Sequence, residues 1–436
     1  MQECVSRELI EFIRKSPTCF HVTDNVTQIL DKEGFVKLQE SGEWELEAGG
    51  RYYVTRNGSS VIAFYMPEHI SGFHIMASHS DSPCFKIKEN PEIPVAKKYI
   101  KLNVEKYGGM LMSTWFDRPL SVAGRVVTEE DGKITTHLVN MDRDTLLIPN
   151  LAIHMNRSVN EEGHKYNAQK DLLPLFGDEQ AEGTFMNRVA EAAGVDAASV
   201  VSHDLFLYPR VPGCIWGPDD AYISSARLDD LECVFSSMKG FLNLEHYDSV
   251  PVLAVLDNEE VGSTTKQGAA SDFMRTTVTR ICYESGLEHK EVQRLLAGSF
   301  MVSADNAHAA HPNYMEKSDL VNRPYMNEGI VIKYNANQKY TTDAISAALF
   351  KQICKKAGVP YQTFFNRSDI IGGSTLGNIS NTQLSMNTVD IGLAQLAMHS
   401  AYETAGTKDI EYLVRASKAF FESCIQCTKD GEYSIS

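Results

Sequence analysis

The chain has 436 residues, of which 43% are hydrophobic and 22% are charged. These proportions are those of a globular protein and exclude a disordered or collagen-like chain. With 57 acidic against 41 basic side chains the net charge is −16, which argues against nucleic-acid binding, because such binding needs a basic surface. The length predicts about two or three domains, large enough to fold without disulfides or a structural metal.

The first ten residues carry charges where a signal peptide would have an apolar stretch, and no window reaches about 18 apolar residues. We therefore expect no transmembrane helix, no membrane partner and a cytoplasmic protein. Nine scattered cysteines, an odd number, favour reduced thiols. Cys424 and Cys427 have redox or half-zinc spacing, but they fall in a helix predicted over 409–428.

The N-terminal part is predicted to contain two helices followed by β-structure. Apolar residues recur on one helical face over 3–15, and a second helix is expected over 23–33. Arg51–Arg56 and residues 61–66 flank Asn57-Gly58, a strong hairpin signal, because both turn residues tolerate positive φ. A short apolar strand is expected at 73–77.

Residues 91–221 differ from the rest of the chain and are interpreted as an inserted β-rich domain. Alternating segments predict antiparallel strands at 101–107, 121–127 and 133–138. The polar stretch 157–185 is predicted to be a loop, and 184–193 a short helix.

From about residue 222 strands alternate with helices, which predicts an α/β domain split between 1–90 and 222–436. Strands are expected at Val250–Leu256, Phe300–Ala304, 329–334, Tyr361–Phe365 and 388–391, and helices at 228–243, 266–285, 341–357 and 409–428. This order predicts a mixed, mostly parallel sheet flanked by helices on both faces.

Acidic residues and histidines follow the ends of several of these strands. They are His79 and Asp81, then Asp257, Glu259 and Glu260, then Asp305 with His308 and His311, and last His399. Because ligands bind beyond the carboxyl ends of parallel strands, we expect these side chains to converge. Carboxylates and imidazoles without cysteine suit Zn²⁺, Mn²⁺ or Co²⁺. The candidate carboxylate bridge between two metals lies in Arg227-Leu228-Asp229-Asp230.

Each of these signals has an ordinary alternative. His79-Ser80-Asp81 pairs a metal-binding imidazole with a carboxylate that would orient it, or is a capped surface turn. Glu259 and Glu260 would point to opposite sides of an extended segment, one to a metal and one as general base. The same pair also suits a helix N-terminus.

Together these segments resemble the M18 metallopeptidase family, the aspartyl aminopeptidases, in order and over residues 79–400. The matching segments are His79-Ser80-Asp81-Ser82-Pro83, Arg227-Leu228-Asp229-Asp230, Asp257-Asn258-Glu259-Glu260-Val261-Gly262-Ser263, Ser303-Ala304-Asp305, His308-Ala309-Ala310-His311-Pro312-Asn313-Tyr314 and Gln395-Leu396-Ala397-Met398-His399-Ser400. The resemblance implies a phosphorylase/hydrolase-like di-zinc peptidase fold.

The resemblance also implies a role for each matching residue. His79 and Asp305 would hold one metal, Glu260 and His399 the other, and Asp229 would bridge them; zinc is expected, with manganese or cobalt as alternatives. Glu259 would be the general base for a bridging hydroxide and later the acid, Asp81 would orient His79, and Asp229-Asp230 would be a cis peptide.

Three further segments are similar to family features that contact substrate. The segment that ends in His154 resembles one that reaches into a neighbouring subunit's active site, which implies a homo-oligomer, a tetrahedral dodecamer. Lys333 matches a lysine that meets an acidic P1 side chain. Residues 367–377 lack the family's Cys-Gly-Thr-Thr but keep a glycine-rich backbone that includes Gly373, so the strictness of the acidic preference stays open.

We therefore expect a metal-dependent aminopeptidase that removes N-terminal Asp or Glu from peptides with a free N-terminus. The alternatives are a broader aminopeptidase, a di-metal carboxypeptidase or amidohydrolase, and a non-catalytic assembly protein. A nucleic-acid or phosphate binder is opposed by the net charge and by the lack of a P-loop.

Overall fold

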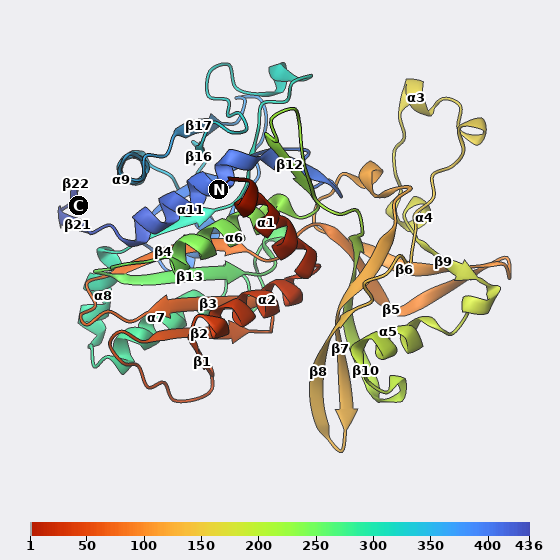
Figure 1. Cartoon of the computed structure of the whole chain (residues 1–436), viewed down its shortest axis with the longest axis horizontal. Coiled ribbons are helices and arrows are strands. Elements are labelled where there is room, and N and C mark those ends of the chain that lie inside the picture. Colours follow the sequence, from red (N-terminus) through yellow and green to blue (C-terminus); the bar gives the residue numbers. More distant parts are fainter. Residues whose placement is uncertain (1) are drawn as a thin grey trace.

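A nine-stranded mixed sheet forms the centre of the larger part of the molecule in the computed structural model, which describes residues 2–436 (Figure 1). From one edge to the other its strands are β1 (Val36–Leu38), β2 (Arg51–Arg56), β3 (Ser60–Tyr65), β13 (Val250–Leu256), β4 (Phe73–His79), β14 (Phe300–Ala304), β18 (Asn387–Gly392), β16 (Ile330–Tyr334) and β17 (Tyr361–Phe365). The four central strands, β13 to β18 in this order, are parallel, and antiparallel β3 and β16 flank them.

Helices cover both faces of this sheet, which confirms the predicted fold class. One face packs on α1 (Gln2–Lys15), α2 (Cys19–Lys32), α6 (Leu228–Leu242), α9 (Ala344–Ala357) and α11 (Thr407–Phe421). The other packs on α7 (Phe273–Glu284), α8 (His289–Ala297) and α10 (Leu376–Gln383). Within β4, Met76 faces the first core and its neighbours Ile75 and Ala77 face the second, as the twofold repeat of a strand requires.

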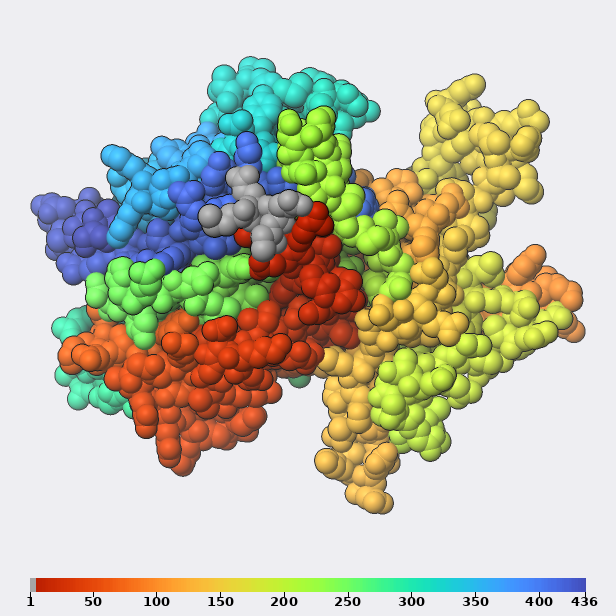
Figure 2. Space-filling view, viewed as in Figure 1, coloured from red at the N-terminus to blue at the C-terminus, as the bar shows by residue number. Residues whose placement is uncertain are grey.

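A second, six-stranded antiparallel sheet projects from this α/β part (Figures 1 and 2). Its strands are β8 (Lys133–Asn140), β7 (Leu120–Glu130), β10 (Val200–Pro209), β5 (Cys84–Val95), β6 (Tyr99–Tyr107) and β9 (Leu175–Asp178). Its own core includes Phe85, Trp115 and Phe185, the last from α5 (Phe185–Ala193). The stretch 157–185 is not wholly a loop as predicted, since it contains β9, α3 (Val159–Glu162) and α4 (Ala168–Asp171).

A third sheet, which the sequence did not predict, joins five short strands. They are β11 (Cys214–Trp216), β12 (Tyr222–Ser225), β20 (Glu403–Gly406), β19 (Ala394–Leu396) and β15 (Ala307–His308). Strands of two to four residues carry too few side chains to show an alternating pattern, so they were not visible in the sequence. This sheet brings the segments after β14 and β18 together with the segment before α6.

Two predicted helices end or begin elsewhere. The last helix, α11, ends at Phe421, so Cys424 and Cys427 do not lie in a helix but in the strand pair β21 (Ile425–Lys429) and β22 (Glu432–Ile435) and the turn before it. The helix predicted from 266 begins only at Phe273, because the preceding residues form tight turns in which a Cβ on Gly268 would lie 2.3 Å from the Ser263 carbonyl.

The hairpin prediction is confirmed. Asn57 and Gly58 join β2 to β3 with φ angles of 59° and 66°. No helix formed by residues 2–436 combines the length and the apolar composition needed to cross a membrane.

Candidate active site

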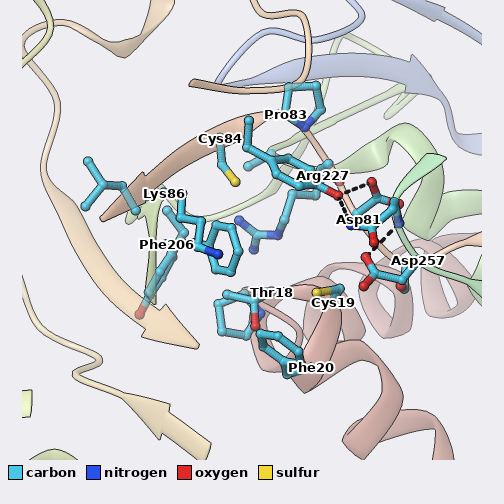
Figure 3. Close-up of a pocket in the computed structure, with 18 of the residues that line it drawn as sticks. Thr18, Cys19, Phe20, Asp81, Pro83, Cys84, Lys86, Phe206, Arg227 and Asp257 are labelled. Carbon is cyan, nitrogen blue, oxygen red and sulfur yellow. Dashed lines mark hydrogen bonds between the residues drawn. The ribbon is translucent and has the colours of Figure 1, made fainter. Parts of the chain in front are cut away.

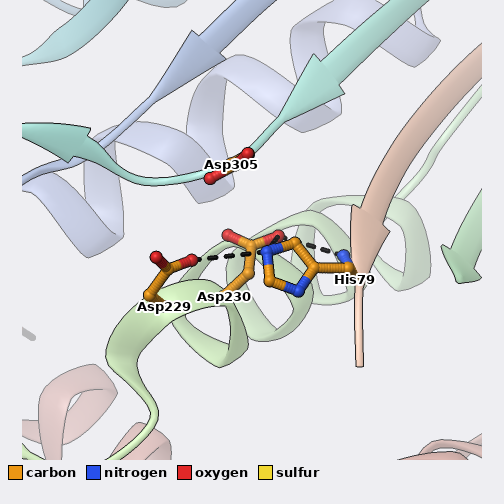
Figure 4. A group of neighbouring side chains, drawn as sticks. All are labelled: His79, Asp229, Asp230 and Asp305. Carbon is orange, nitrogen blue, oxygen red and sulfur yellow. Dashed lines mark hydrogen bonds and ion pairs between the residues drawn. The ribbon is translucent and has the colours of Figure 1, made fainter. Parts of the chain in front are cut away.

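Acidic residues and histidines from five separate segments meet where the central parallel strands end. His79 is the last residue of β4, Asp305 follows β14, and Glu259 and Glu260 begin the turn after β13. Asp229 lies at the start of α6 (Figure 4), and His399 lies between β19 and β20. The parallel order of β13, β4 and β14 places these ends at one edge of the sheet, as expected from the sequence.

Asp229 is the centre of this set because its two carboxylate oxygens face different histidines. Oδ1 lies 3.3 Å from Nε2 of His79, and Oδ2 lies 3.4 Å from Nε2 of His399. The same nitrogen of His399 is 3.4 Å from Oε1 of Glu260. Asp229 is almost fully buried, with 2% of its surface exposed. A carboxylate in this position can contact two cations at once, one toward each histidine.

The potential ligand atoms form three overlapping groups in which all atoms lie within 4.8 Å of one another. The groups are His79 with Asp229, Asp230 and Asp305; His79 with Glu259 and Glu260; and Asp229 with Glu260 and His399. The sequence left Asp230 open as a candidate bridge, but the resemblance assigned that role to Asp229 alone. Its peptide bond to Asp229 is cis, as the resemblance implied.

Hydrogen bonds fix the side chains of this set. The backbone N–H of His79 donates to Asp230 at 3.0 Å, and its Nδ1 lies 3.0 Å from the carbonyl oxygen and 3.4 Å from the carboxylate of Asp81. The Asp81 carboxylate also accepts the N–H groups of Glu259 and Glu260, each at 3.1 Å. The Tyr107 hydroxyl donates to it at 2.6 Å. Asp81 therefore connects β4 to the turn after β13.

Glu403 is a second buried carboxylate that holds this set and that sequence reasoning missed. It accepts the backbone N–H of Asp229 at 3.0 Å and that of His399 at 2.6 Å. Burial and the nearby Asp229 raise the pKa of Glu403 to about 8. No sequence pattern marks this residue, which is recognised only because β20 lies beside β12 and β19.

The charges of the set are strongly unbalanced. Burial, together with Asp305 and Asp81, raises the pKa of Glu259 to about 8. Burial and the Asp229 charge raise the pKa of Glu260 well above its usual value. Buried carboxylate oxygens of Asp229, Asp230 and Glu260 have no hydrogen-bond partner among residues 2–436. Closely packed, unpartnered carboxylate oxygens with imidazole nitrogens are the donors that divalent transition metals need, so these residues fit such ions.

A cavity of about 320 Å³ opens onto these groups and is lined by Glu259, Lys333 and Gly373. Lys333 is buried, with its ammonium donating to the Asn306 carbonyl at 2.9 Å and lying 3.7 Å from the Asp305 carboxylate. It is therefore not a free cation. Gly373 leaves open space, since a Cβ built on it would meet no atom of the described chain within 4 Å.

The remaining candidate histidines lie outside the three groups. His308 lines the cavity, and burial and Lys333 lower its pKa. His311 accepts a hydrogen bond from the Asn313 N–H at 3.1 Å. His154 belongs to the exposed turn Ile153–Met155 and does not line this cavity.

Comparison with known proteins places the chain in a family. A family model described as "Aminopeptidase I zinc metalloprotease (M18)" matches residues 12–421. A "Probable M18 family aminopeptidase 2" of Clostridium acetobutylicum is 46% identical over 425 residues, covering 95% of this chain and 98% of that protein. One of Pseudomonas aeruginosa is 40% identical, covering 97% and 99%.

Solved structures agree with this result. A chain of the Ape4 and Nbr1 complex superposes with a TM-score of 0.93 at 34% identity, covering 97% of this chain and 86% of that chain. A chain of the S. cerevesiae mApe1 dodecamer gives a TM-score of 0.83 at 29% identity, covering 96% of each. The family match covers nearly all of the chain. The chain therefore belongs to the M18 family and is a metallo-aminopeptidase.

Proposed function

We propose that the protein is a two-metal aminopeptidase that prefers peptides with N-terminal Asp or Glu. The observation that supports two ions is the position of Asp229, whose two oxygens face His79 and His399 at 3.3 and 3.4 Å. His79 and Asp305 would hold one ion, and Glu260 and His399 the other, with Asp229 between them. Zinc is the expected metal, in line with the family description. When bound, the ions would supply Lewis acidity at the scissile carbonyl.

Glu259 is the general base in this proposal. It lines the cavity, and no lysine or arginine among the described residues forms an ion pair with its carboxylate, so it remains available to a water molecule. It would take one proton from the attacking water and then deliver that proton to the nitrogen of the leaving peptide. The same carboxylate would thus act first as a base and then as an acid. Asp81 would keep His79 oriented, since its carbonyl and carboxylate both face Nδ1.

Lys333 is the proposed determinant of the acidic preference, and Gly373 would leave room for a backbone contact with substrate. An acidic P1 side chain would share the ammonium with Asp305, which already lies 3.7 Å from it. We expect Lys333→Met to lower the ratio of kcat/KM for Asp over Leu substrates by about tenfold or more, since a charged partner is lost. Because this ratio compares two substrates of the same variant, it cancels any general effect that the substitution has through Asp305. An unchanged ratio would show that another group selects the acidic side chain.

Assembly completes the proposed site. The exposed turn that carries His154 also exposes Leu151, Ile153 and Met155, an apolar surface suited to contact with another subunit. The related mApe1 structure is that of a dodecamer. We propose a homo-oligomer, a tetrahedral dodecamer, in which His154 of one subunit reaches the cavity of the next. The β-rich region 91–221 would be the inserted assembly domain between the halves 1–90 and 222–436.

The function is tested with Asp, Glu, Leu and Lys p-nitroanilides after chelation and after return of Zn²⁺, Mn²⁺ or Co²⁺. Metal-dependent cleavage that favours Asp or Glu is expected. Cleavage of Leu or Lys instead would keep the aminopeptidase and reject the acidic preference. Glu259→Gln is expected to keep the metals, as measured by elemental analysis, and to lose turnover. Retained turnover in this variant would reject Glu259 as the base.

A further inference from the structure

A second cavity, of about 340 Å³, lies next to the predicted metal ligands and is lined by Asp81 and Asp229 among others (Figure 3). Its walls come from the turn between α1 and α2, from β5 and β10 of the six-stranded sheet, and from the residues before α6. Asp229 lines this cavity as well as the one that holds Glu259. Its size falls at the lower end of the range for small-molecule sites, about 300–1,000 Å³.

Arg227 lines this cavity, and no carboxylate of residues 2–436 forms an ion pair with its guanidinium. Figure 3 shows its side chain reaching into the space, with Cys84, Phe206 and Cys19 around it. One Nη donates to the Ile13 carbonyl at 3.1 Å, but Nε and the other Nη are buried and have no hydrogen-bond partner in this part of the chain. An unpaired buried charge is costly, and an anion would relieve that cost.

The other buried and half-buried charged groups of the cavity already have partners. Lys86 and Arg125 share the Asp204 carboxylate, at 2.7 and 2.9 Å. Asp81 accepts three hydrogen bonds, and Asp257 accepts from Gln267 and from the Asn258 N–H. Arg227 is thus the buried cation that this wall leaves without a carboxylate, whereas Lys266, which also lines the cavity, is exposed.

The rest of the lining is apolar and aromatic. Phe20 and Phe206 lie next to each other, with ring centroids 6.4 Å apart, and Pro17 and Trp115 also contribute. The buried indole N–H of Trp115 has no acceptor within the described residues. A ligand that suits these walls has a flat apolar body and one anionic group that accepts hydrogen bonds.

We propose that this cavity binds a small organic carboxylate, with its carboxylate on Arg227 and an apolar body against Phe206 and Trp115. This cavity is distinct from the one that Glu259 lines, although Asp229, a proposed metal ligand, forms part of both walls.

The proposal is tested by calorimetric titration of the metal-loaded protein with 3-phenylpropionate and with its neutral amide. The acid is expected to bind about tenfold more tightly or better, because only its carboxylate can pair with Arg227. Equal affinity of acid and amide would overturn the proposal. Arg227→Met is expected to remove the advantage of the acid and to leave the amide unchanged, whereas an equal loss for both would contradict the predicted pairing.

A second pair of variants keeps the test independent of Arg227, which is close to Asp229. Cys84→Phe fills the cavity and is expected to abolish binding of both ligands. Cys84→Ser keeps the cavity open and is expected to retain binding of both ligands. Binding that survives Cys84→Phe would take place elsewhere, for example at the metals, and would overturn the proposal.

Discussion

Glu403 illustrates how a single residue outside every motif can support the site. Its carboxylate accepts N–H groups from Asp229 and His399, the central and an outer member of the predicted ligand set. In Glu403→Gln one of these N–H groups would face an amide NH₂ instead of an oxygen. We expect metal affinity to fall by about 10- to 100-fold, as for other residues that orient ligands. Metal titration of the apoprotein checks this.

The matched control is Glu422→Gln. Glu422 also accepts a backbone N–H, that of Glu245 at 2.8 Å, but at the opposite end of α11. The Glu422→Gln variant should therefore leave metal affinity unchanged. An equal loss in both variants would mean that the effect comes from stability in general.

Because of the buried side chain of His74, we predict that the free energy of unfolding falls in acid. It is buried, it stacks on Phe420 with ring centroids 5.0 Å apart, and burial lowers its pKa from 6.5 to about 4. Between these two values the unfolded chain binds a proton that the folded chain does not. The free energy of unfolding therefore falls as the pH drops through this window, by up to about 3 kcal/mol for this group.

His74→Phe keeps the stacking and removes the titration. Relative to the wild type, its free energy of unfolding should improve steadily from pH 6.5 to pH 4, as measured by urea unfolding. The same substitution at the exposed His69, a ring that water solvates in both states, serves as the control. Parallel pH profiles for wild type and His74→Phe would refute the assignment.

At the residue scale, the sequence predicted those site residues that directly follow strong strands. His79, Glu259 and Asp305 come after continuous apolar runs, so their convergence could be expected. Asp230, Tyr107 and Glu403 act through contacts between segments up to 174 residues apart, and such contacts leave no local pattern. The roles of all these residues stay predictions until variants are tested.

At the scale of elements, β18 passes very close to the segment that carries Asp305. A Cβ on Gly392 would lie 1.9 Å from the Asp305 carbonyl oxygen. Gly392→Ala must therefore push the two segments apart. We expect a loss of about 1–3 kcal/mol in the free energy of unfolding, together with weaker metal binding. Chemical unfolding and metal titration measure the two effects.

Gly298→Ala is the control, because its Cβ would have no neighbour nearer than 3.7 Å among the described residues. It should alter neither property measurably. If Gly392→Ala lost stability but bound metal normally, the close approach would be structural and would not position Asp305.

Elements were predicted well where they are long and periodic. The helices α1, α2, α6, α9 and α11 and the central strands agree with the expected ranges within a few residues, apart from the C-terminal end of α11. The third sheet was missed because its strands have two to four residues each. These short strands nevertheless carry Glu403 and flank His399, so the part of the fold that was hardest to predict lies directly at the site.

For the whole molecule, the test of assembly is complementation between subunits. His154→Ala and Glu259→Gln chains are each expected to have low activity when made alone. If His154 acts on a neighbouring subunit, mixed oligomers from co-expression should regain activity, because a His154→Ala site keeps its own Glu259 and receives a neighbour's histidine. Activity that only equals the sum of the separate variants would place His154 within its own subunit. Sedimentation confirms that the oligomers form.

The proposed ligands extend from His79 to His399, across most of the chain. During synthesis a ribosome must therefore pass residue 399 before the set of proposed ligands is complete. A half-made copy lacks some of the proposed ligands and could not hold the two proposed ions. Hydrolysis would thus begin only after all of these segments have been made and have folded together.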